Sequence, residues 1–132
     1  MRRLIDPETQ EELLVPDEID DTRAIEHARR GRRGELRRIR FFLDYGHGYP
    51  LWESGSDSYV MTPDDYGLSP ELARRLRDWA LVWERHHDPF TGWDDETRHQ
   101  RWLTDGDALV AALEIEIYDV AVVLPEFRKY GM

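Results

Sequence analysis

The sequence contains no cysteine and no asparagine, and only one of its 18 basic residues is lysine. The absence of cysteine excludes disulfide bonds, thiol nucleophiles, iron–sulfur clusters and cysteine-based zinc sites. Small secreted domains often depend on disulfides, so this absence favours the cytoplasm. Arginine codons are rich in G and C, whereas lysine and asparagine codons are rich in A and T. We therefore infer a GC-rich bacterial or phage source.

Long apolar runs are also missing. No segment approaches the roughly 20 apolar residues of a membrane span, and no apolar stretch of about 7–15 residues follows the basic start, as a signal peptide requires. We expect a cytoplasmic protein without a membrane partner. The 132 residues are the usual size of one domain, and 40% of them are apolar. That fraction is enough for one core and excludes global disorder.

The formal net charge of −10 is unevenly distributed along the chain. Residues 1–22 carry a net charge of −6, residues 23–40 carry +6, and residues 41–132 carry −10. A strongly acidic body repels nucleic acid and favours a basic partner.

The Arg-rich segment 23–40 is a candidate for contacting nucleic-acid phosphates. Its four candidate residues are Arg29, Arg30, Arg32 and Arg33. Two alternatives stay open: these side chains pair with the acidic body or with residues 6–21, or they form a solvated helix face.

Residues 1–36 are predicted to form an N-terminal arm, and residues 37–132 a compact domain. In the arm, apolar residues flank the segment 6–9, whose Pro7 suits a type I turn, so we expect a hairpin over residues 1–16. A short helix is expected from Thr22 to Arg30, where glycines follow.

The compact domain begins with alternating residues typical of a strand with one buried face. Ile39, Phe41, Leu43 and Tyr45 form the apolar series. Further strands are expected at residues 51–53, 58–61 and 120–124, with turns at 45–50 and 54–57.

Two helices separate these strands. Ser69-Pro70 is a strong helix start, and the apolar stripe that follows ends by Pro89. Asp94 or Asp95 caps a second helix that we expect to continue to Ile117 despite Gly106, with a break near residues 104–106 as the alternative. The predicted fold is α+β, with the two helices packed on one face of a small, mostly antiparallel sheet.

The loop around His47 has the most enzyme-like local sequence, with a glycine on each side and Asp44, Tyr45 and Tyr49 nearby. A histidine beside a carboxylate can act as a general base. The alternative is a glycine-rich turn with an exposed histidine. No nucleophile accompanies it at a diagnostic spacing, so we name no catalytic residue.

Aromatic residues supply the other candidates. Trp79, Trp83 and Trp102 lie on helix stripes and are expected in the core. Trp52 can face either side of its strand. Phe90 and Trp93 occupy the loop between the helices, where an aromatic side chain is either a packed lid or a binding anchor.

The histidine pair His86-His87, with His99, is a weak metal motif, because adjacent helical side chains point about 100° apart. Histidine at a helix C-terminus is favoured by the helix dipole, which explains the pair without a metal. There is no glycine-rich phosphate loop and no calcium-loop pattern. We expect no metal and no cofactor.

The run from Asp64 to Leu72, followed by Leu76, Trp79 and Trp83, resembles small acidic uncharacterised proteins of GC-rich bacteria. Trp102, Gly106 and Leu113 continue the resemblance, which covers about residues 38–125. It implies a fold but no activity and no site residues.

The favoured function is a non-enzymatic protein-interaction module, of the inhibitor or immunity type, that binds a basic partner. Its interface candidates are His47, Tyr49, Trp52, Phe90 and Trp93. The alternatives are a nucleic-acid-associated regulatory protein that uses residues 23–40, a phage or assembly subunit, and an enzyme centred on the His47 loop.

Overall fold

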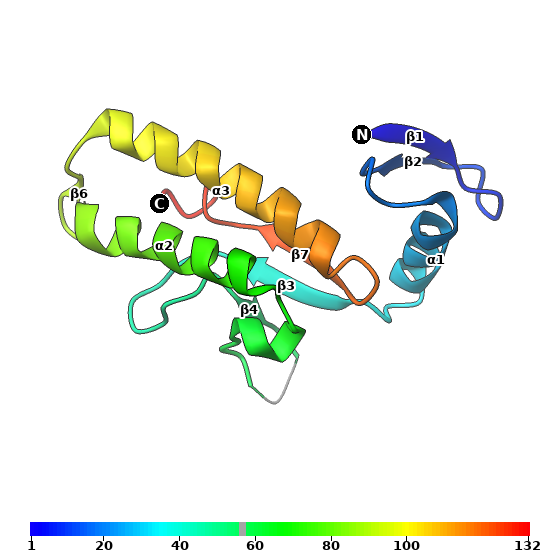
Figure 1. Cartoon of the computed structure of the whole chain (residues 1–132), viewed down its shortest axis with the longest axis horizontal. Coiled ribbons are helices and arrows are strands. Elements are labelled where there is room, and N and C mark those ends of the chain that lie inside the picture. Colours follow the sequence, from blue (N-terminus) through cyan, green and yellow to red (C-terminus); the bar gives the residue numbers. More distant parts are fainter. Residues whose placement is uncertain (56–57) are drawn as a thin grey trace.

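The computed structural model describes residues 1–55 and 58–132. Part of the turn expected at 54–57 therefore lies outside the described residues. Figure 1 shows two long helices lying over a small sheet, with the N-terminal elements to one side. The described ranges contain three α-helices and small, mostly antiparallel sheets, which confirms the predicted α+β class.

The N-terminal elements match their predicted ranges closely. Strands β1 (Arg2–Ile5) and β2 (Glu12–Val15) form an antiparallel hairpin. Helix α1 spans Asp21–Arg32. Its N-cap is Asp20, whose side chain accepts a hydrogen bond from the backbone N–H of Arg23. A free carboxylate at this position satisfies an N–H group that lacks a partner within the helix.

The central sheet has the strand order β4-β3-β7. Strand β3 (Arg37–Phe41) pairs antiparallel with β4 (Trp52–Glu53) and parallel with β7 (Ala121–Pro125). The parallel pairing is possible because the long connection between β3 and β7 contains both main helices. The strand predicted at 58–61 is reduced to a single bridge between Trp52 and Val60. A 3₁₀ turn, η1 (Pro63–Tyr66), then leads into the helices.

Helices α2 (Pro70–His86) and α3 (Glu96–Glu116) begin at the predicted caps Ser69 and Asp95. A short hairpin that the sequence did not predict joins them, formed by the two-residue strands β5 (His87–Asp88) and β6 (Gly92–Trp93). Helix α3 is continuous through Gly106, so the alternative of a break near residues 104–106 is wrong.

The core lies between the two helices and one face of the sheet. Ile39, Phe41 and Leu43 point into it and are fully buried, as the alternation predicted. Tyr45 does not continue this series: it is about half exposed and lies in the loop that follows β3. The three helical tryptophans expected in the core are all buried (Trp79, Trp83 and Trp102).

Gly106 explains how the helices approach the sheet so closely. A Cβ atom built there would lie 2.8 Å from both Phe127 Cζ and Trp79 Cζ2, atoms of large buried rings. In contrast, a Cβ at Gly31 of α1 would meet only Leu36 Cδ1, at an ordinary 3.7 Å.

These two glycines give a matched test of packing. Gly106→Ala should lower the free energy of unfolding by about 1–3 kcal/mol through overpacking. Gly31→Ala should leave it unchanged or raise it by up to about 1 kcal/mol through helix propensity. Urea unfolding followed by circular dichroism measures both. Equal effects of the two substitutions would contradict the close contact at Gly106.

Candidate binding surface

The sheet face opposite the two helices carries a cluster of aromatic side chains. Phe42 stacks on Trp52 with ring centroids 5.0 Å apart, and Tyr130 meets Phe42 edge-on at 5.4 Å. Tyr59 packs against Trp52 at 5.2 Å. Arg40 points to this side because its neighbours Ile39 and Phe41 point into the core. We call Phe42, Trp52, Tyr59 and Tyr130, with Arg40 at their centre, the aromatic face.

Arg40 connects the members of the aromatic face. Its guanidinium donates to Glu126 (Nε to Oε2, 2.9 Å) and to the hydroxyl oxygens of Tyr59 (2.9 Å) and Tyr130 (2.5 Å). It also lies over the Phe42 ring, 5.2 Å from the centroid. The hydrogen bond to Glu126 raises the pKa of Arg40, and the same bond lowers the pKa of Glu126 below its ordinary value of 4.5. The pair is therefore ionised at neutral pH and holds the surrounding rings in place.

Three of the predicted interface residues lie in or beside the aromatic face. His47 contacts Trp52 edge-on at 4.9 Å and Tyr49 at 6.2 Å. Trp52 is nearly buried, and its indole N–H donates to the carbonyl oxygen of Phe42 at 2.9 Å. The loop is held from the other side by Arg77, which donates to the carbonyl oxygen of Gly48 at 3.2 Å.

The same geometry gives no support to a catalytic His47. Its buried Nε2 has no hydrogen-bond partner among the described residues. Asp44, the carboxylate expected to assist it, instead accepts a hydrogen bond from the backbone N–H of Tyr45 at 2.8 Å. A histidine base needs a group that orients it.

The other two predicted interface residues lie at the turn between α2 and α3. Phe90 is 94% exposed, whereas Trp93 is half-buried between His99 (5.0 Å, stacked) and Trp102 (5.2 Å). Trp93 therefore packs as a lid over the end of the core, and Phe90 projects from the turn. Tyr45 connects the two groups of candidates: its ring lies 4.8 Å from Trp83, and its hydroxyl lies 3.5 Å from His87 Nδ1.

The histidines at this turn have partners other than a metal. His86 Nδ1 bonds Asp94 at 2.8 Å, and His99 Nε2 bonds the carbonyl oxygen of Met132 at 2.8 Å. Burial lowers the pKa of His87, which favours its neutral form. Within residues 1–55 and 58–132, no group of three acidic or histidine side chains is arranged to hold a metal ion.

The arginines proposed to contact nucleic acid are largely engaged within the protein. Arg29 bonds Glu8 at 2.5 Å, and Arg32 bonds Glu8 at 2.6 Å and the buried Asp6 at 2.7 Å. Arg30 donates to the carbonyl oxygen of Asp119. Arg33 is exposed. These pairs correspond to the alternative in which the arginines neutralise residues 6–21.

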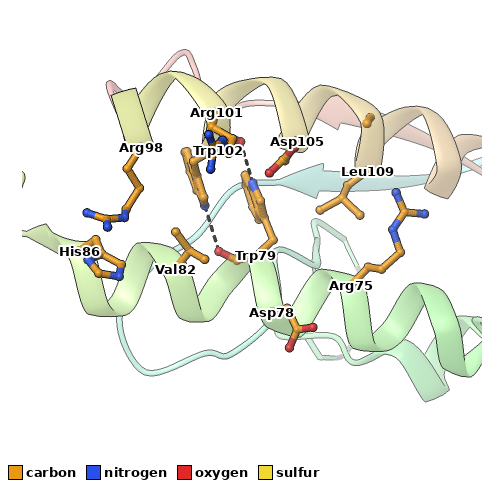
Figure 2. A pocket seen from close by; sticks show the side chains of 11 residues that line it. Arg75, Asp78, Trp79, Val82, His86, Arg98, Arg101, Trp102, Asp105 and Leu109 are labelled. Carbon is orange, nitrogen blue, oxygen red and sulfur yellow. Dashed lines mark hydrogen bonds between the residues drawn. The ribbon is translucent and has the colours of Figure 1, made fainter. Parts of the chain in front are cut away.

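A groove of about 430 Å³ separates α2 and α3 on the outer side of the helices. Figure 2 shows Trp79 and Trp102 side by side between them, joined by two hydrogen bonds. Both rings are almost fully buried, so the groove exposes little of them. Its rim carries charges of both signs (Arg75, Arg98, Arg101, Asp78 and Asp105). Because charges of both signs line the groove, it favours neither an anionic nor a cationic ligand.

The sequence family described as Serratia CdiI immunity protein-like matches residues 37–124. The chain belongs to this family. The comparison with curated proteins finds no match. An immunity-type role in protein interaction is thus shown at the level of the family. None of the helices described is both long and apolar enough to cross a membrane.

The immunity protein-like match begins with β3 and ends within β7. It includes all five predicted interface residues together with Phe42 and Tyr59 of the aromatic face, whereas Tyr130 and residues 1–36 lie outside it. Sequence reasoning missed Arg40, Phe42, Tyr59 and Tyr130 as surface candidates. A signal was available for two of them: Arg40 and Phe42 alternate with the core residues Ile39 and Phe41, so they lie on the other side of the chain, where an exposed apolar patch marks an interaction site.

The Arg40–Glu126 pair gives a pH-dependent prediction for this member of the immunity protein-like family. A carboxylate with a lowered pKa stabilises the folded state at neutral pH, and this contribution is lost as the pH falls below about 4.5 through the folded-state pKa. Glu126→Gln should therefore destabilise the protein at pH 7, and its difference from wild type should shrink on acidification. Urea unfolding at several pH values measures the difference.

Glu18→Gln is the control for the change in net charge, because Glu18 is exposed. A difference between wild type and Glu126→Gln that stays constant from pH 7 to pH 3 would contradict the ion pair.

Proposed function

We propose that the chain is an immunity protein that acts in the cytoplasm by binding and neutralising a toxic, basic partner protein. The observation that carries this proposal is the match of residues 37–124 to the immunity protein-like family. The exposed aromatic face supports it independently, because it offers a surface for a protein rather than a site for chemistry.

The composition of the aromatic face suits protein binding. Tryptophan, tyrosine and arginine are the residues most enriched at interface hot spots. Tyr59 and Tyr130 are each more than 40% exposed, yet Arg40 holds both hydroxyls in place. Rings ordered before binding lose little conformational entropy in the complex. A partner can therefore cover this face at low entropic cost.

The charge of the compact region supports a basic partner. Residues 37–132 carry a net charge of −7, because Arg37, Arg38 and Arg40 offset part of the −10 of residues 41–132. Beside the exposed Phe90, the turn between α2 and α3 presents Asp88 and Asp95, while Asp94 is paired with Arg98. An acidic rim around an apolar anchor steers a basic protein into contact and sets its orientation. The association rate should then fall as salt is added.

Neutralisation can be tested directly. The tagged chain is used at low salt to capture partners from its source cell, and each captured protein is expressed in a test cell with and without the chain. We expect a basic protein that is released by salt, stops growth when expressed alone, and permits growth when the chain is present. Captured proteins that are harmless would contradict the proposal, and capture of nucleic acid alone would favour the alternative based on residues 23–40.

Truncation of exposed aromatic residues locates the binding surface. Tyr130→Ala and Phe90→Ala should each weaken partner binding by about 30-fold or more where the residue is a hot spot. Val120→Ala, which truncates an exposed apolar residue away from both groups, should leave affinity within about twofold. Isothermal titration with the identified partner measures all three. Equal affinities of all variants would show that binding occurs elsewhere.

A further inference from the structure

A second cavity, of about 250 Å³, lies between the N-terminal elements and the compact region. Leu14 and Pro16 form its wall on the side of β2, and His27 contributes from α1. Glu114 of α3 and residues 118 and 121–123 complete it. Cavities for small molecules commonly span about 300–1,000 Å³, so this one has the size of a single long side chain.

Glu114 is the group in this cavity that lacks a partner. It is about half-buried, and it forms no hydrogen bond or ion pair with any described residue. Burial alone raises the pKa of its carboxyl group, with no cation to oppose the shift. A partly buried carboxylate without a partner costs free energy, which folded proteins usually avoid unless a ligand completes the site.

The other ionisable groups that line the cavity are already engaged. His27 Nδ1 bonds the carbonyl oxygen of Tyr118 at 2.7 Å, and its ring stacks on Tyr118 with centroids 4.0 Å apart. The amino group of Met1 lies 3.3 Å from Asp17 Oδ2. The cavity therefore offers one uncompensated negative charge, surrounded largely by apolar side chains.

We propose that this cavity receives an arginine side chain of the basic partner, with the guanidinium paired to Glu114 and the methylene groups against Leu14, Pro16 and Val122. The statement that this arginine belongs to a partner protein rests on the proposed function. A guanidinium matches a carboxylate with two parallel hydrogen bonds. The aliphatic stem of arginine is the part that apolar walls accommodate.

The proposal gives residues 1–36 a role as an arm that forms one wall of the site. The arm is held on the compact region by a small apolar cluster of Val15, Ile19 and Ala24 around Tyr118. Arg23 strengthens this contact through Asp119 at 3.0 Å. The family match over residues 37–124 includes Glu114 and Tyr118, whereas the wall of the cavity that the arm supplies lies outside it.

The first test needs no partner protein. Butylguanidinium is titrated into the full-length chain and followed by amide NMR shifts, with butylurea as the neutral analogue of the same shape. We expect saturable shifts at His27, Tyr118 and Val122 with millimolar affinity for butylguanidinium, and none for butylurea. Shifts at these residues that do not saturate, or equal shifts with butylurea, would overturn the proposal.

Two variants assign the effect to the carboxylate. Glu114→Gln should weaken butylguanidinium binding by about tenfold or more, whereas Glu18→Gln, which removes the same charge from an exposed site, should change it by less than about twofold. Glu114→Gln should also melt at the same temperature as wild type or higher, because it removes an unpaired buried charge. A lower melting temperature would mean that Glu114 has a structural partner, which contradicts the proposal.

The partner experiment separates this inference from the immunity role. If the chain neutralises a toxin but Glu114→Gln and Glu18→Gln bind that toxin equally, the arginine site is wrong and the immunity role stands. If the NMR titration succeeds but no toxin is neutralised, the cavity binds guanidinium groups and the immunity role is wrong. Butylguanidinium that stays bound in the complex with the partner would also overturn the arginine site, because the partner would then not occupy it.

Discussion

The contact between Trp79 and Trp102 determines how the rest of the compact region is arranged. Their rings are parallel within 2°, with centroids 4.1 Å apart, and each indole N–H donates to the carbonyl oxygen of the other residue. A buried indole N–H must find an acceptor. A helical carbonyl oxygen that already accepts one bond has a second lone pair available. The two helices thus satisfy each other's buried donors, which fixes the register of α2 against α3.

The position of the sheet follows from this register. Gly106 lies one turn beyond Trp102, and the space left by its missing side chain is filled by the rings of Trp79 and Phe127. Phe127 lies two residues after the end of β7, so its contact with Trp79 (5.4 Å) brings that strand under the helices. On the opposite face, Arg40 of β3 binds Glu126 beside it. The pairing of β3 with β7 is therefore held by aromatic packing on the inner face and by an ion pair on the outer face.

Local signals explain what the sequence could predict. The caps Asp95 and Ser69-Pro70, and the alternation from Ile39 to Leu43, act over a few residues, and all three appear as expected. The hairpin β5–β6 was missed because its strands contain only two residues each, too few for any period. The parallel pairing of β3 with β7 joins residues 84 positions apart, and no local pattern encodes such a partner.

The candidate surface also depends on contacts between residues far apart in the sequence, which local patterns do not predict. Trp52 and His47 were identified from their neighbours in the chain, but Tyr59 and Tyr130 join them through tertiary contacts, namely ring packing and hydrogen bonds to Arg40. Such a group can be recognised once the sheet order is known. Trp93 had two possible roles, lid or anchor, and its stacking on His99 places it against the core while Phe90 remains exposed.

The charge pattern explains why residues 1–40 leave unchanged the acidity that a basic partner would meet. The net charges of residues 1–22 and 23–40 are equal and opposite. Asp6 and Glu8 bring them together by binding Arg29 and Arg32. The field around the molecule then comes mainly from residues 41–132, which carry the whole net charge of −10. A segment neutralised in this way does not attract phosphate strongly, and it leaves residues 41–132 free to attract a basic protein.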